Sequence, residues 1–239
     1  MSGHSKWSKV KHQKATTDVV KSAHFTKATH AIMIAVKEGG GVTDPNSNFH
    51  LRLAVEKARG VNMPKENIDR AIAKASGEGA AAIEQIMYEG YCPGGVAMMI
   101  EAATDNRQRA VSQVKNVLER AGGTLASPGA VAFQFERRGV MTVPKTGLTY
   151  DALLSAGIDA GAEDVVETLD LFEVYTRPTD LFKVKTALEG KGIVIDNAVL
   201  IMHPTMTIVA DEAHRAKIEA LVGEMEELED VHTVFTNLA

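Results

Sequence analysis

The apolar residues in the first third of the chain recur every three or four positions, which is the period of an amphipathic helix. One helix is predicted over 18–38, where a run of three glycines ends it, and a second over 51–60. A third is predicted to open at Pro64, where the missing N–H costs nothing. Strand-like alternation is absent from this part of the sequence, so residues 1–80 are predicted to form a helical domain.

The third helix makes two specific predictions about side chains. Ile68 and Ile72 both fall on its apolar stripe and are expected to pack inside the domain. Glu66 and Arg70 stand four residues apart in the favourable order and are expected to form an ion pair.

The pattern changes after the boundary signal Ser76-Gly77-Glu78-Gly79, because strand-like segments now alternate with helical ones. Residues 86–100 predict a hairpin in which Pro93-Gly94 suits the centre of a type II turn, and Thr104-Asp105 is a helix N-cap signal. Further strands are predicted at 131–135, 140–143, on both sides of Asp170, 193–195, 199–202, 206–210 and 231–236. Further helices are predicted at 150–160, 178–189 and 211–227.

This order of elements predicts an α+β fold with mainly antiparallel sheets. Repeated strand–strand–helix units favour two small split-βαβ, ferredoxin-like domains over one doubly wound parallel sheet.

Composition excludes several classes of protein. The chain has 239 residues, of which 45% are hydrophobic and 24% charged, so it is not predicted to be largely disordered. Cys92 is its one cysteine, which excludes an internal disulfide framework and fits a reducing compartment. Since the sequence contains neither a membrane-length apolar run nor a signal-peptide pattern, we expect a cytoplasmic protein without a membrane partner.

The net charge of −5 hides an asymmetry between the two parts of the chain. Residues 1–80 contain 13 Lys and Arg against 7 Asp and Glu, whereas the remainder contains 13 against 24. Six of the lysines lie within residues 1–30, beside a single acid, Asp18. Such segregation is typical of a basic arm or domain that meets a polyanion.

The N-terminal lysines are too irregularly spaced to share one helical stripe, so they favour either a flexible segment that follows phosphates or a solvated face. Trp7 lies among them and is predicted either to stack on a base or to anchor the arm against the helical domain. The candidate nucleic-acid-binding residues are Lys6, Trp7, Lys9, Lys11, His12, Lys14, Lys21, Lys27, Arg52, Arg59 and Arg70.

Patterns for other chemistry are missing from the sequence. The histidines do not form the i, i+4 pair of a helical zinc site, and the glycine-rich stretches lack the P-loop and dinucleotide-binding patterns. Cys92 has no neighbouring base in sequence and is interpreted as structural, and the acidic run at 224–230 is interpreted as a solvated helix end. We therefore expect no catalytic residues, cofactor, metal or small-molecule substrate.

Several longer motifs resemble the YebC/PmpR family, and they run in order along essentially the whole chain. They are Gly3-His4-Ser5-Lys6-Trp7, the segment 62–72, the segment 88–97 around Cys92-Pro93-Gly94-Gly95, Thr104-Asp105-Asn106-Arg107 and Phe133-Gln134-Phe135-Glu136. The chain departs from the usual pattern at Cys92, where the family usually has glycine, and near Lys21, where it often has arginine.

The resemblance implies three domains: a basic helical domain at 1–80, a discontinuous α+β domain at 81–130 with 204–239, and an inserted α+β domain at 131–203. It also implies a non-enzymatic, nucleic-acid-binding regulator of gene expression. Binding of DNA in transcription comes first, although no helix-turn-helix pattern is visible. The alternative is a ribosome-associated factor that assists synthesis of proline-rich stretches. The sequence leaves the oligomeric state open, with a monomer preferred.

Overall fold

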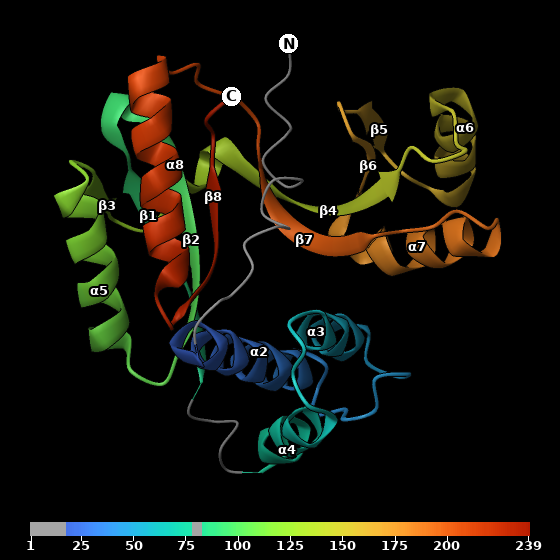
Figure 1. Cartoon of the computed structure of the whole chain (residues 1–239), viewed down its shortest axis with the longest axis horizontal. Coiled ribbons are helices and arrows are strands. Elements are labelled where there is room, and N and C mark those ends of the chain that lie inside the picture. The colour runs from blue at the N-terminus through green and yellow to red at the C-terminus, as the bar shows by residue number, and fades with distance from the viewer. Residues whose placement is uncertain (1–17, 78–82) are drawn as a thin grey trace. The chain divides into compact units, whose positions relative to one another are not determined.

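Three helices form the N-terminal part of the structure, a computed structural model that describes residues 18–77 and 83–239 (Figure 1). They are α2 (Asp18–Glu38), α3 (Phe49–Gly60) and α4 (Lys65–Ala75). Both α3 and α4 pack against α2, around a core that includes Ile32, Leu51 and Ile68. The buried Asn48 fixes the start of α3, because its side-chain oxygen accepts from the backbone N–H of Leu51 at 3.1 Å.

The first sheet has the strand order β3-β1-β2-β8. Its strands are β1 (Glu84–Tyr91), β2 (Ala97–Thr104), β3 (Thr124–Ala126) and β8 (Val231–Thr236). Both β2 and β3 run antiparallel to β1 and therefore parallel to each other, so α5 (Arg107–Arg120) between them completes a split βαβ unit. Helices α5 and α8 (Glu212–Glu227) lie beside this sheet (Figure 1). Their side chains share one hydrophobic core with it.

The second sheet has the strand order β5-β6-β4-β7. Its strands are β4 (Phe135–Pro144), β5 (Asp164–Glu167), β6 (Leu171–Thr176) and β7 (Asn197–Pro204). With α6 (Tyr150–Ala160) and α7 (Leu181–Gly190), they follow in the order β-α-β-β-α-β, which is ferredoxin-like. Helix α7 approaches β4 closely at Gly139, where a Cβ would lie 2.4 Å from the Thr176 hydroxyl and 3.0 Å from Leu181.

The second sheet belongs to a unit of its own, residues 135–207, while the described residues of 14–134 and 208–238 form the other unit. Asn237, which is 1% exposed, forms hydrogen bonds with the two residues that flank the unit 135–207 in sequence, Gln134 and Ile208. Its side-chain amide donates to Gln134 Oε1 at 2.8 Å, and its carbonyl accepts from the N–H of Ile208 at 2.7 Å.

The α+β class with a helical domain and two antiparallel sheets is confirmed. So is the type II turn: Gly94 has φ 79° and ψ 9°, and the N–H of Gly95 donates to the carbonyl of Cys92 at 3.2 Å. The division at 1–80, 81–130 with 204–239, and 131–203 stays a prediction.

Four local predictions were wrong, and at 131–135 and 193–195 the reason is that other groups take the backbone N–H groups. The cap of α5 is Asn106, not Thr104-Asp105. Residues 131–134 contain a 3₁₀ turn, with Phe133 74% exposed, and β4 begins only at Phe135.

Residues 193–195 form no strand, because the N–H of Ile193 donates to the carbonyl of Leu188 and so closes α7. Of residues 206–210, only Ile208 forms a bridge, with Leu238.

Candidate nucleic-acid interface

Helices α3 and α4 present several exposed cations of the helical domain, and Lys37 on α2 is exposed as well. Arg59 lies in the last turn of α3, and Lys65 is the first residue of α4, one position after Pro64. Arg70 and Lys74 follow on α4 and stand four residues apart on one face of it. All four residues are exposed.

None of these four cations forms an ion pair with another residue of the described ranges 18–77 and 83–239. The predicted pair between Glu66 and Arg70 is therefore wrong, which is consistent with the small gain that an exposed pair of this kind brings. No carboxylate of a described residue lies within 4.0 Å of these four cations to neutralise their charge.

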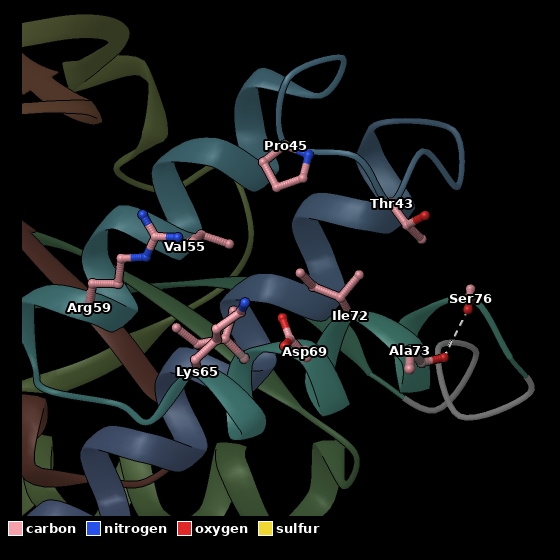
Figure 2. Close-up of a pocket in the computed structure, with 10 residues that line it drawn as sticks. Thr43, Pro45, Val55, Arg59, Lys65, Asp69, Ile72, Ala73 and Ser76 are labelled. Atoms are coloured by element: carbon pink, nitrogen blue, oxygen red, sulfur yellow. Dashed lines mark hydrogen bonds between the residues drawn. The ribbon is translucent and has the colours of Figure 1, made fainter.

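An open groove of about 430 Å³ lies between α4, α3 and the loop before α3 (Figure 2). Its floor is aliphatic and includes Val55, Ile68 and Ile72, of which Ile72 is the most exposed. Ile68 is buried as predicted, whereas Ile72 is only partly buried because it faces the groove. Arg59 and Lys65 stand at the same end of the groove (Figure 2).

Lys27, by contrast, lies inside the unit rather than on an open surface. Its amine donates to the backbone carbonyl of Glu226 near the end of α8. Burial, together with the nearby Lys57, lowers the pKa of Lys27 to about 8, against the opposing effect of Glu226.

Two histidine rings lie where α2 packs against the first sheet. His30 on α2 contacts the carbonyl oxygen of Ala103 at 3.1 Å, and its ring is nearly parallel to that of His232 at 6.3 Å between centroids. Within the described part of the chain, Nε2 of His232 has no hydrogen-bond partner. Burial and the nearby cations lower the pKa of His232 to about 3.

The other candidate residues fall into two groups. Arg52 braces the loop before α3, since its guanidinium donates to the carbonyls of Pro45 and Asn46 at 2.9 and 2.8 Å. Lys21 belongs to α2. Outside the described residues lie Lys6, Trp7, Lys9, Lys11, His12 and Lys14. The binding roles of all these residues stay predictions.

Two buried carboxylates could not be recognised from the sequence. Asp230 was interpreted as part of a solvated helix end, but its side chain is 1% exposed and accepts two hydrogen bonds from Arg109, at 2.9 and 3.0 Å. Glu89 accepts from the N–H groups of Gly129, Val131 and Ala132 at 2.6–3.0 Å. Burial alone would raise the pKa of Glu89, but these three donors hold it below its usual value.

A third buried acid, Glu173, lies in the unit 135–207, and it accepts from the Tyr175 hydroxyl at 2.7 Å. Burial and this carboxylate raise the pKa of Tyr175. No group of three or more His, Cys, Asp or Glu suited to a metal ion occurs in the described ranges. Among the same residues, no helix has the length and apolar character needed to cross a membrane.

Two family models together match nearly the whole chain. One describes the TACO1/YebC protein N-terminal domain and matches residues 5–78. The other describes the TACO1/YebC second and third domain and matches residues 83–238.

Similar proteins span the same length. A protein named "Probable transcriptional regulatory protein" from Dehalococcoides mccartyi is 45% identical over 99% of this chain and 94% of its own. One of the same name from Sulfurihydrogenibium is 42% identical over 99% and 95%. The crystal structure of a conserved hypothetical protein from Aquifex aeolicus is 39% identical, superposes with a TM-score of 0.85, and covers 98% of this chain and 96% of that one.

The relatives from Dehalococcoides and Sulfurihydrogenibium carry the name of probable transcriptional regulators. The division of the family models into an N-terminal domain and a second and third domain fits three domains. The chain is a member of the TACO1/YebC family.

Proposed function

We propose that the helical domain binds nucleic acid through its unpaired cations, and that the protein regulates gene expression without catalysing a reaction. The observation that carries the proposal is the exposure of Arg59, Lys65, Arg70 and Lys74 without an ion-pair partner among the described residues. A phosphate backbone would supply the missing negative charges, and each contact would release counterions.

DNA is the first target in this proposal, because the relatives are named probable transcriptional regulatory proteins. The alternative target is ribosomal RNA, in a factor that assists synthesis of proline-rich stretches. One observation favours this alternative: the sequence shows no helix-turn-helix pattern, which weakens the case for a sequence-specific reader of the major groove.

The remaining candidate residues belong to the same proposal. The lysines and His12 of the N-terminal arm would add phosphate contacts, and Trp7 would stack on a base or anchor the arm. Lys21 would add a further contact. Lys27 and Arg52 now donate hydrogen bonds to backbone carbonyls, and these bonds would have to break before either side chain could bind a phosphate. The proposed location is the cytoplasm, where a lone buried thiol such as Cys92 stays reduced.

Two matched variants test the proposal. In the first, Arg59, Lys65, Arg70 and Lys74 are replaced by alanine. In the second, four cations that form ion pairs, Lys115, Arg120, Lys145 and Lys191, are replaced by alanine. Both variants lose four positive charges, so only the positions of the charges differ.

The first variant should lose at least about tenfold in affinity for a DNA duplex or for purified ribosomes, while the second stays within about threefold. Equal losses would contradict the proposal. Crosslinking in cells followed by sequencing then separates the two targets, because promoter DNA and ribosomal RNA give different reads.

A further inference from the structure

The two ends of the groove between α3 and α4 differ in charge. One stripe of α4 lines it, at the spacing that places side chains on one face: Lys65, Ile68, Asp69, Ile72, Ala73 and Ser76. At 1.5 Å per residue this stripe is roughly 16 Å long. The cationic end carries Arg59 and Lys65, and the far end carries the hydroxyls of Thr43 and Ser76 (Figure 2). The middle is aliphatic apart from the carboxylate of Asp69.

We infer that this groove receives one unstacked base of a single-stranded nucleic acid, with the adjoining phosphate on Arg59 and Lys65. The inference rests on the proposed function and adds the form of the ligand. An aliphatic floor offers nothing to a phosphate, whereas the flat face of a base gains by leaving water against Val55 and Ile72. In a duplex these base faces are already stacked, so a regular duplex cannot use the floor.

Charge complementarity selects a nucleic acid over an apolar protein helix as the occupant. Arg59 and Lys65 form no ion pair with described residues, and they stand together at one end of the apolar stretch. An anionic group that adjoins an apolar plane matches this arrangement, and a nucleotide is built in that way.

Asp69 adds a chemical preference among the bases. Its exposed carboxylate lines the middle of the groove and can only accept hydrogen bonds when ionised. The exocyclic amino group of cytosine is a donor that carboxylates accept from, whereas thymine and uracil present a carbonyl at the same position. The groove is therefore expected to prefer cytosine over thymine or uracil.

Three variants of the full chain test the inference. Ala73→Phe fills the groove from an exposed position, and Asp69→Asn removes the carboxylate charge and adds an N–H donor. Ala216→Phe is the matched control, because Ala216 is an exposed helical alanine on α8. Fluorescence anisotropy is measured with oligo(dC), oligo(dT), oligo(rC) and oligo(rU) of about 12 nucleotides, and with a DNA duplex.

Ala73→Phe should weaken binding of the cytosine strands by at least about fivefold and leave duplex affinity within about twofold, like the control. Asp69→Asn should abolish the preference for cytosine over thymine and uracil. Comparison of the DNA and RNA strands then identifies which sugar the groove accepts. Photocrosslinks from a cytosine strand that carries 5-iodocytosine should map to residues 65–76.

Three results would overturn the inference: unchanged binding by Ala73→Phe, an equal loss for the duplex, or crosslinks confined to other segments. In those cases the proposed function still stands if the four-alanine variant of Arg59, Lys65, Arg70 and Lys74 binds weakly. If that variant binds normally, the proposed function fails as well.

Discussion

The lysines and arginines of the helical domain differ from those of residues 83–239 in how they are neutralised. In the α+β part, eight of them form ion pairs with carboxylates: Arg109, Lys115, Arg120, Arg138, Lys145, Arg177, Lys185 and Lys191. In the helical domain, Arg59, Lys65, Arg70 and Lys74 form none with described residues. Among the described residues of this domain, His50 Nδ1 lies 3.8 Å from a carboxylate oxygen of Glu38.

This difference in ion pairing affects the electrostatic field around the protein more than it affects the stability of the fold. Exposed ion pairs contribute little to folding, typically about 0–1 kcal/mol each. They do cancel positive charge locally, so the α+β part attracts a polyanion only weakly. The unpaired cations keep their field, which is what a surface that meets phosphates requires.

The largest expected effect comes from breaking the ion pair between Arg109 and the buried carboxylate of Asp230. Arg109→Ala should cost about 3 kcal/mol of unfolding free energy, because it leaves the carboxylate of Asp230 buried without its partner. Urea unfolding measures the change. Arg107→Ala is the control, since Arg107 is exposed and forms no ion pair with described residues. Similar losses in both variants would show that the pair is not structural.

The next prediction compares a core residue of the helical domain, Ile68, with a residue of the groove floor, Ile72. Ile68→Ala should cost about 2–4 kcal/mol, because Ile68 is 4% exposed. Ile72→Ala should cost less, about 1 kcal/mol, because Ile72 is only partly buried. Equal costs in denaturant melts would mean that Ile72 is a core residue and that the groove closes in solution.

The junction between the helical domain and the first sheet should be sensitive to acid. The pKa of His232 is lowered to about 3 in the folded chain, so between about pH 3 and 6.5 the unfolded chain binds more protons. Stability is then lost as the pH falls through this window. His232→Phe keeps a ring against His30 but removes the titration, and should reduce the loss between pH 7 and pH 5 by up to about 2 kcal/mol. Parallel stability profiles of the two proteins would contradict this account.

The smallest effect concerns Cys92, which is buried in the α+β part. Cys92→Ser and Cys92→Gly should leave nucleic-acid affinity within about twofold, because the residue is remote in sequence from the unpaired cations and occupies the first position of a turn. Affinity is compared on samples that are shown to be folded by circular dichroism. A loss of binding in folded Cys92→Gly would give the thiol a role in the interface.

Much of this fold follows from local patterns, and the exceptions have a common cause. The helix at Tyr150–Ala160 and the turn at Pro93-Gly94 depend on residues close together in sequence, so their patterns predict them. The strand expected at 131–135 fails because Glu89, some forty residues away, takes the N–H groups of Val131 and Ala132. A pattern within one segment carries no record of such a partner.

The candidate interface was predictable in part for the same reason. The charge asymmetry and the cations at Arg59 and Arg70 can be read from the sequence. That Lys27 binds a carbonyl of α8, and that Lys65 joins Arg59 beside an apolar groove, depends on how the helices pack.

The salt dependence of binding tests the central claim most directly. The logarithm of the affinity for a DNA duplex is plotted against the logarithm of salt concentration for the wild type and for the two four-alanine variants. Replacing Arg59, Lys65, Arg70 and Lys74 should flatten the slope by up to about 0.9 for each phosphate of duplex DNA that is no longer neutralised, or about 0.7 on a single strand. Replacing Lys115, Arg120, Lys145 and Lys191 should leave the slope as in the wild type. Equal slopes in all three proteins, or flattening only in the second variant, would contradict the claim that the unpaired cations of the helical domain bind the phosphates.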